Sequence, residues 1–307
     1  MKTERTKITA VVSLLASAII IGFSYVVLKT GLKYALPFTV LIDRLLIAML
    51  VIFLLKKTGV ITIDKISNEQ KVKLFFLSTL YPIAFFLFQN FGIKHITASE
   101  ASIIYSLIPI LTTIASAIVL KEKTTGLQKF GILLSFGGIA YISFRSFNGF
   151  SDSAIGYILI FCSLLSMVFY YVFLKKSVAK ISPVSITYYL VLFAVLSSVV
   201  VYLGWGLINY QTLPDLDRLE NYGYVIAILY LGVLSTLGTS LLTSIGIKNL
   251  SAVQTSIFSN ISPFFGILAG VLIMGDVLQT YQIIGAICIF TGMFISLRYT
   301  TKNIATL

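Results

Sequence analysis

The stretch GIKHITASEASIIYSLIP, residues 92–109, recurs later in the chain as GIKNLSAVQTSIFSNISP, residues 246–263. The two copies lie 154 residues apart and share glycine, lysine, serine and proline positions as well as apolar ones. In the same frame Glu122 corresponds to Asp276 and Gly138 to Gly292. Chance similarity between apolar segments does not reproduce polar, glycine and proline positions at one fixed offset. The sequence therefore predicts an internal duplication.

The composition is that of a membrane protein. Of the 307 residues, 58% are hydrophobic and 11% are charged, and the mean hydropathy is +0.98. A soluble core cannot hide so much apolar surface. Apolar windows of about 20 residues, enough to cross about 30 Å of hydrocarbon as a helix, recur along the chain. We expect an all-α polytopic protein embedded in the lipid bilayer of a bacterial cell (inner or plasma) membrane.

The apolar windows number ten, and each predicts one transmembrane helix. The N-terminal window imitates a signal peptide, but it continues without a break to about Leu28, which is too long for a signal sequence. We therefore expect it to be retained as the first helix. The windows are 8–28, 38–55, 71–91, 98–120, 127–145, 154–174, 184–207, 222–243, 252–274 and 280–298.

The duplication divides these windows into two halves of five helices, residues 1–150 and 151–307. Because five is odd, a first half that begins inside the cell requires a second half that begins outside, so the halves are predicted to be inverted repeats. With the N-terminus inside, 17 of the 23 Lys and Arg residues fall on the cytoplasmic side. This bias predicts cytoplasmic N- and C-termini. It also accounts for the net charge of +12, so we expect no nucleic-acid partner.

Two prolines fall near the midpoints of predicted helices, Pro109 in the fourth and Pro263 in the ninth. A proline inside a helix removes one backbone hydrogen bond. Membrane helices tolerate it where neighbouring groups or a cavity satisfy the freed carbonyl. The matched pair predicts hinges or kinks beside a binding site at mid-depth. The alternative is that each proline is only a packing kink.

Uncharged polar residues cluster close to these prolines. Tyr105 precedes Pro109, whereas Ser259 and Asn260 precede Pro263, and Gln89 and Asn90 lie late in the third predicted helix. Such side chains either bind a polar ligand or join helices by hydrogen bonds, and both uses are compatible with the sequence.

Charged residues inside predicted helices are costly and indicate function by default. Asp43 and Arg44 lie within the second helix, where they could attract a substrate or gate its passage. The alternatives are a structural ion pair or a residue that reaches the outer interface. Glu122 and Asp276 end the fourth and ninth helices at matched positions, and we interpret them as a structural pair that ties helix ends to partners.

The sequence offers little for catalysis or for cofactors. It has one histidine, His95, and two cysteines, Cys162 and Cys288, in no metal-binding spacing. Phosphate-binding, metalloprotease, nucleophile-elbow and dinucleotide motifs are missing. We therefore expect no enzyme activity, no metal and no cofactor. No acidic residue is clearly placed at mid-membrane, which leaves proton coupling open, as it does the oligomeric state.

Two five-helix halves, the repeated GIKxxxAxxxSI…P…E/D pattern and Arg44 together resemble the EamA family of the drug/metabolite transporter superfamily. The resemblance spans the whole chain and departs from the family at Asp276, where glutamate is usual. It implies a ten-helix bundle in which helices one, three, four, six, eight and nine surround a cavity, with five and ten packed behind. The substrate-binding candidates that it implies are Tyr25, Gln89, Asn90, Tyr105, Tyr170, Tyr230, Ser259 and Asn260.

The expected function is secondary transport of a small molecule by alternating access. An exporter of amino acids or related amphipathic solutes fits the uncharged, aromatic lining best. The alternatives are a drug, vitamin or sugar transporter, or an uptake permease, on the same fold. A membrane-embedded enzyme is disfavoured because it would need clustered His, Asp, Glu or Cys within the bilayer.

Overall fold

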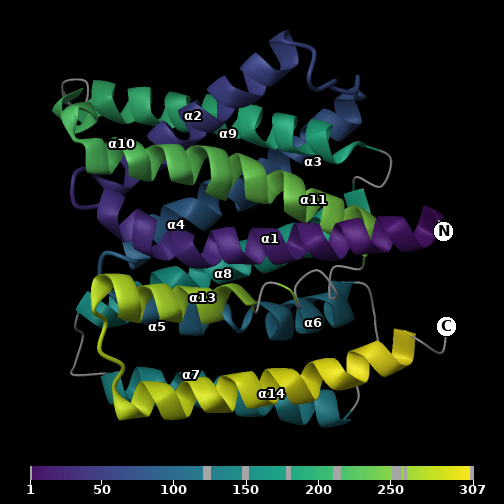
Figure 1. Ribbon diagram of the computed structural model, residues 1–307, viewed down its shortest axis with the longest axis vertical. Helices are drawn as coiled ribbons and strands as arrows, with labels where there is room; N and C mark the ends of the chain where they lie inside the picture. The colour runs from purple at the N-terminus through teal and green to yellow at the C-terminus, as the bar shows by residue number, and fades with distance from the viewer. Residues whose placement is uncertain are drawn as a thin grey trace.

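A computed structural model of the protein describes residues 2–119, 126–146, 152–177, 181–209, 216–250, 258 and 261–304, which form helices and turns without any strand (Figure 1). The helices up to residue 146 are α1 (Lys2–Gly31), α2 (Pro37–Lys57), α3 (Asn68–Ser78), η1 (Thr79–Ala84), α4 (Phe85–Gly92), α5 (Ala98–Tyr105), α6 (Ile108–Val119) and α7 (Gly126–Ser146). Those that follow are α8 (Asp152–Ser177), α9 (Pro183–Asn209), η2 (Leu216–Glu220), α10 (Tyr222–Leu229), η3 (Tyr230–Gly238), α11 (Thr239–Asn249), α13 (Ile261–Ala269), η4 (Gly270–Met274) and α14 (Thr280–Ile304).

Each predicted apolar window falls on helical structure wherever its residues are described. Several windows are composite: the third is α3–η1–α4, the fourth α5–α6, the eighth α10–η3–α11 and the ninth α13–η4. Among the described residues, seven helical segments are long and apolar enough to cross a membrane, and the regions of α13–η4 and α14 add shorter apolar helices. The chain is therefore an all-helical, multi-pass membrane protein. The count of ten spans and their inverted order stay predictions.

Local sequence signals explain where several helices begin. Pro37 opens α2, a position at which its missing N–H costs nothing. A capping box opens α3: the side chain of Ser67 accepts from the backbone N–H of Gln70, and the side chain of Gln70 accepts from the backbone N–H of Ser67. Thr97 and Glu100 form the same arrangement at the start of α5. These caps satisfy backbone N–H groups that an isolated helix end would leave unpaired.

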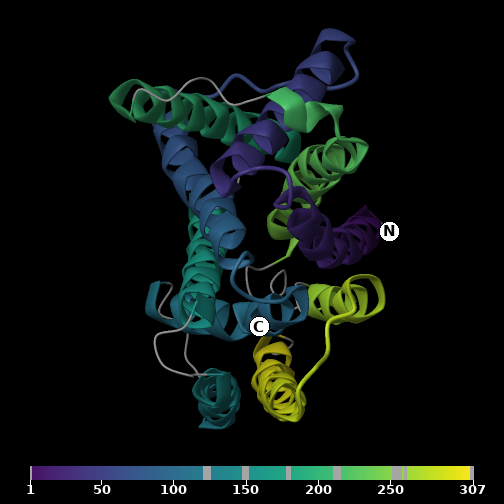
Figure 2. The same ribbon diagram turned by 90° about the vertical axis from the view of Figure 1, so that its left-hand side faces the viewer.

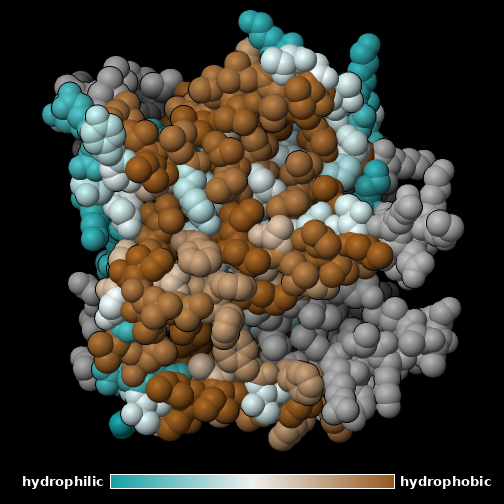
Figure 3. All heavy atoms as spheres, in the orientation of Figure 1, coloured by the Kyte–Doolittle hydropathy of each residue, from teal (hydrophilic) through white to brown (hydrophobic). Residues whose placement is uncertain are grey.

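Apolar side chains cover much of the outer surface. Figure 3 shows a broad hydrophobic face, with hydrophilic residues gathered toward the ends of the helices. Leu133, Phe294 and Phe53 are more than half exposed, at 70%, 63% and 52%. In water such a patch would drive association. On a membrane protein these side chains form the surface that contacts lipid.

Helices α7 and α14 pack on each other and stand apart from the main bundle (Figures 1 and 2). Their contact runs along glycines, because a Cβ atom added to Gly138 would lie 2.7 Å from the carbonyl oxygen of Gly285, and one added to Gly292 would meet the backbone of Gly131. The Oγ of Ser135 donates to the carbonyl of Ile289 at 3.0 Å. Small residues thus let two backbones approach closely, as membrane helix pairs commonly do.

Replacing Gly138 with valine should separate α7 from α14. The new side chain has no space, and overpacking of this kind costs about 1–3 kcal/mol of stability. The thermal unfolding midpoint of the detergent-purified protein should fall accordingly. Gly137→Val is the matched control, since Gly137 is exposed and a Cβ there meets nothing within 4 Å. Equal shifts for the two variants would contradict the packing of this pair.

Candidate functional site

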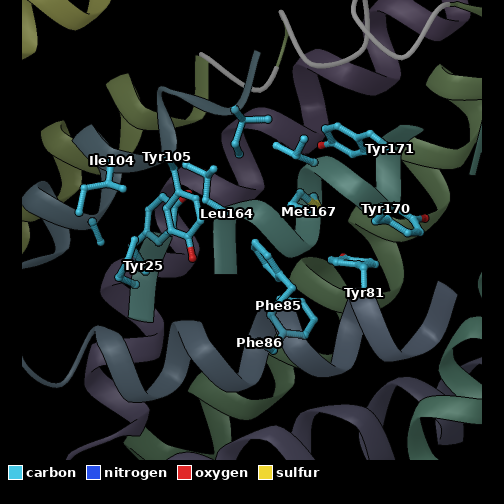
Figure 4. Close-up of a cluster of buried hydrophobic side chains, with 14 of the residues drawn as sticks. Tyr25, Tyr81, Phe85, Phe86, Ile104, Tyr105, Leu164, Met167, Tyr170 and Tyr171 are labelled. Carbon is cyan, nitrogen blue, oxygen red and sulfur yellow. The ribbon is translucent and has the colours of Figure 1, made fainter. Parts of the chain in front are cut away.

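A cavity lies within the bundle, and six of its fourteen lining residues are aromatic; Figure 4 labels these six. The space open to water-sized molecules is about 20 Å³, room for about one water molecule. The walls come from the first, third, fourth, sixth, eighth and ninth predicted helices, the ring that the resemblance implies, while α7 and α14 contribute none. The lining residues are Ile21, Ser24, Tyr25, Tyr81, Phe85, Phe86, Gln89, Tyr105, Ile108, Met167, Tyr171, Ser235, Thr239 and Ser262.

The helices around this cavity are interrupted at its depth. The third predicted helix passes through η1, where Tyr81 has non-helical φ and ψ of −139° and 122° and precedes Pro82. The eighth passes through the π-helical segment η3. The fourth breaks between Tyr105, the last residue of α5, and Ile108, the first of α6. Interrupted backbone at membrane depth is tolerated where it is buried in protein or lines a cavity.

Pro109 lies at a helix start rather than in a helix interior. Pro109 is the second residue of α6, so its missing N–H falls among the donors that have no intrahelical partner. The fourth predicted window, 98–120, thus contains a short turn at residues 106–107 just before the proline, and Ala98–Val119 together is long and apolar enough to cross a membrane. Pro263 is the third residue of α13, and most of the residues that precede it lie outside the described part of the chain. The role of both prolines as hinges stays a prediction.

Tyrosines and phenylalanines form a continuous layer around the cavity (Figure 4). The rings of Tyr25 and Tyr105 stack with centroids 5.3 Å apart and planes inclined by 16°. The hydroxyl of Tyr105 lies 2.7 Å from the Oγ of Ser163, which donates to the carbonyl of Phe85 at 2.8 Å. On the opposite side Tyr81 packs against Tyr170, with centroids 4.8 Å apart. The lining therefore offers flat apolar faces with fixed hydroxyl groups.

The structure brings some of the predicted binding residues to the cavity and keeps others away. Tyr25, Gln89 and Tyr105 line it. Three do not: the Asn90 amide donates to the carbonyl of Pro37 at 2.9 Å, Tyr230 donates to the carbonyl of Ile20 at 2.8 Å, and Tyr170 is buried behind Tyr81. Ser259 and Asn260 lie outside the described residues. All of these assignments as binding residues stay predictions.

Sequence reasoning missed most of the lining, although the repeat carried a signal for it. Ten of the fourteen lining residues form five pairs at the offsets of the duplication, so equivalent positions of the two halves meet at the cavity. Comparing cavity candidates from one half with their counterparts in the other would have found Tyr171, for example, from Tyr25. The pairs 146 residues apart are Ile21–Met167 and Tyr25–Tyr171, and those 154 apart are Tyr81–Ser235, Phe85–Thr239 and Ile108–Ser262.

Asp43 and Arg44 point to different neighbours. Asp43 pairs with Arg218, at 2.9 Å from Nε and 3.2 Å from Nη2, and accepts from the hydroxyl of Tyr224 at 2.6 Å. The hydrogen bonds to this carboxylate raise the pKa of Arg218 above its ordinary value. Asp43 therefore joins α2 to η2 and α10. Arg44 is fully buried and donates to the hydroxyls of Thr236 and Ser235 in η3.

A second polar network joins helix ends near the start of α5. Asp276 accepts hydrogen bonds from the backbone N–H and the hydroxyl of Ser99, at 3.1 and 3.0 Å. Its partner is thus the N-terminus of α5, where the helix dipole favours an anion, and not that of the following helix α14. Glu100 accepts from Tyr157 and from Gln282, both at 2.7 Å. Glu122, the repeat counterpart of Asp276, lies outside the described residues.

The fold and the site define a class of protein: a polytopic helical bundle with an internal cavity lined by aromatic, aliphatic and uncharged polar side chains, as expected for a carrier of small solutes. The sequence profile of the EamA-like transporter family matches residues 8–144 and 154–298. The starts of these two segments are 146 residues apart and their ends 154, the two offsets of the duplication. The chain belongs to this family, within the drug/metabolite transporter superfamily, and is a transporter of that type.

Relatives with the same organisation support this assignment. The uncharacterized transporter YcxC of Bacillus subtilis (strain 168) is 32% identical over 302 residues, which cover 96% of this chain and 95% of the relative. An uncharacterized transporter of Archaeoglobus fulgidus is 26% identical over 282 residues, with 90% and 94% covered. A protein of known crystal structure shares the fold, with a TM-score of 0.67 at 15% identity over 94% of this chain and 96% of that one.

Replacing Glu100 with glutamine should weaken the network at the start of α5. The carboxylate accepts from the backbone of Thr97 as well as from Tyr157 and Gln282, and an amide has only one acceptor oxygen for these three donors. The loss of at least one partly buried hydrogen bond should lower stability by about 1–3 kcal/mol. Chemical or thermal unfolding in detergent measures it. Glu69→Gln, an exposed control, should change the midpoint little; a similar change in both would contradict the role of this network.

Proposed function

We propose that this protein is a secondary transporter that exports small amphipathic metabolites, amino acids or closely related solutes, from the bacterial cytoplasm. Transport proceeds by alternating access between two inverted halves, residues 1–150 and 151–307. The protein lies in the cell membrane with both termini in the cytoplasm. The basic residues support this orientation through their excess on the cytoplasmic side, as does the arrangement of α1 and α14, whose terminal ends lie on the same side of the molecule (Figure 1).

The proposal rests above all on the position of the cavity. It lies where the third, fourth and eighth predicted helices are interrupted, and its lining draws equivalent positions from both halves. In transporters built from inverted repeats the substrate site lies near the midplane, at the interface of the repeats and beside discontinuous helices. The same geometry would let one half rock against the other about a fixed site.

The two ends of the bundle differ in a way that supports a closed outer side. Near the start of α5, Lys29 donates to the carbonyl of Ile96 at 3.0 Å, and Asp276 and Glu100 join further helices there. Toward the N-terminal end of α1, a second small cavity shares Ile21 and Tyr171 with the first. With the N-terminus in the cytoplasm, this second cavity lies on the path from the central site to the cytoplasm.

The lining supports an amphipathic solute. Its described side chains are aromatic, aliphatic or uncharged and polar. Aromatic faces bind apolar groups, and the amide of Gln89 with the hydroxyls of Ser24 and Thr239 can orient a polar one. The central space is too small for a metabolite in this conformation, so the helices must separate to admit one.

The transport reaction can be tested with purified protein in sealed liposomes. A mixed pool of amino acids and other small metabolites is offered, and mass spectrometry measures accumulation with and without a proton gradient. We expect accumulation of one chemical class that contains amino acids or related solutes. Protein-free liposomes give the background, and movement of sugars or vitamins alone would contradict the proposed substrate class.

Gln89→Leu should reduce that transport about tenfold or more. The substitution nearly keeps the side-chain volume but removes the amide from the cavity, which costs the hydrogen bonds that orient a solute. Gln279→Leu makes the same chemical change at an exposed position before α14 and should leave the rate unchanged. Wild-type rates in a correctly folded Gln89→Leu protein would remove Gln89 from the site.

A further inference from the structure

Arg44 is a buried cation without an anion. Its side chain is 0% exposed within α2. The neighbouring carboxylate, Asp43, is paired with Arg218 instead. Across the residues that the structure describes, no ion pair involves Arg44. The segments 251–257 and 259–260, which precede α13, also contain no Asp or Glu. A buried charge that lacks a partner is strongly unfavourable, so this position calls for an anion.

The hydrogen bonds of Arg44 leave one end of its guanidinium free. Nε donates to the Oγ1 of Thr236 at 2.9 Å, and Nη2 donates to the Oγ of Ser235 at 3.1 Å and to the carbonyl of Leu231 at 3.4 Å. All three acceptors are neutral. Nη1 is buried and has no hydrogen-bond partner among the described residues. Its two N–H groups are the donors with which a guanidinium can hold a carboxylate.

The free end of Arg44 lies against the wall of the central cavity. The guanidinium carbon lies 3.5 Å from the centre of the Phe86 ring, and both Phe86 and Ser235 line the cavity. Figure 4 shows Phe86 next to Phe85, with Tyr81 nearby. Rotation of the Phe86 side chain would therefore connect the guanidinium with the cavity. The described lining contains no Asp, Glu, Lys or Arg, and Arg44 contacts two of its residues, Phe86 and Ser235.

We propose that Arg44 is the anion-binding group of this site and that the substrate is an organic monocarboxylate with an aromatic or aliphatic body. The inference rests on the proposed transport function and narrows its substrate class. Nη1 donates to the carboxylate, while the tyrosine and phenylalanine rings contact the apolar body. No carboxylate in the described lining can pair with an ammonium group, so a net anion binds better than a zwitterion, and a cation binds worst.

Ligand binding to the full-length protein in lipid nanodiscs tests this directly. The probes are 3-phenylpropionate, its neutral analogue 3-phenylpropionamide, the zwitterion phenylalanine and the cation phenethylamine, titrated by calorimetry. We expect 3-phenylpropionate to bind about 10- to 100-fold more tightly than the amide, the range for hydrogen bonds to a charged group. Phenethylamine should bind most weakly. Equal affinities for the carboxylate and the amide, or tighter binding of the amine, would overturn the inference.

Substitutions then assign the preference to Arg44. Arg44→Gln should abolish the difference between the carboxylate and the amide. Arg44→Lys should keep the charge but lose the Nη1 donor that the η3 hydrogen bonds of Nε and Nη2 hold in place, and so weaken carboxylate binding about tenfold without changing amide binding. This second variant decides the test if Arg44→Gln does not fold, and an equal loss for both probes would sink the idea. Arg218→Gln, which removes a partly buried cation that pairs with Asp43, should leave the preference intact.

Two further arms separate this inference from its alternatives. If chloride competes with 3-phenylpropionate and stabilises the protein against heat at similar concentrations, Arg44 holds an inorganic ion and the inference fails. If the liposomes move neutral solutes without any preference for carboxylates, the transport proposal stands and this inference fails. If carboxylates bind in an Arg44-dependent manner but no solute crosses the liposome membrane, the site stands and the transport proposal fails.

Discussion

Every backbone polar group inside a bilayer needs a partner within the protein, and this constraint governs the structure wherever its helices are interrupted. At the π-helical segment η3 the carbonyl of Leu231 accepts from the hydroxyl of Thr236 at 2.7 Å and from Arg44 at 3.4 Å. At the break between α5 and α6, the hydroxyl of Ser106 donates to the carbonyl of Ile103 at 2.5 Å. Hydroxyl groups and one guanidinium thus take over where regular helical bonding stops. The cavity lies beside these interruptions.

The same need for hydrogen-bond partners explains why Arg44 can occupy the interior. A guanidinium has five N–H donors and suits a place where several acceptors face one point. Two hydroxyls and a carbonyl of η3 form such a place, and the ring of Phe86 covers one face of the charge. Stabilising the irregular backbone and binding an anion are therefore compatible roles for one side chain. Occupation of the cavity would in turn act on the conformation of η3.

The two ends of the bundle are chemically unequal despite the duplication. Ser99, Glu100 and Tyr157 build the network that closes one end. Their counterparts in the duplication are, in the same order, Val253, Gln254 and Val11. Valine side chains cannot form the side-chain hydrogen bonds of serine or tyrosine, so these two bonds have no counterpart in the sequence of the other half. In the proposed inverted arrangement, the outer side would close with polar bonds that the inner side lacks, which gives the transport cycle two energetically different states.

The sequence by itself determined the membrane environment, the helical class and the duplication. Hydrophobic length and matched polar, glycine and proline positions are local properties that can be counted along the chain. Tertiary structure alone decided which polar groups reach the cavity. Gln89 and Asn90 are adjacent and chemically alike, yet Gln89 lines the cavity while Asn90 binds the carbonyl of Pro37 on another helix. The rotation of each helix about its axis depends on partners distant in sequence. Asp43 likewise pairs with Arg218, which lies 175 residues away.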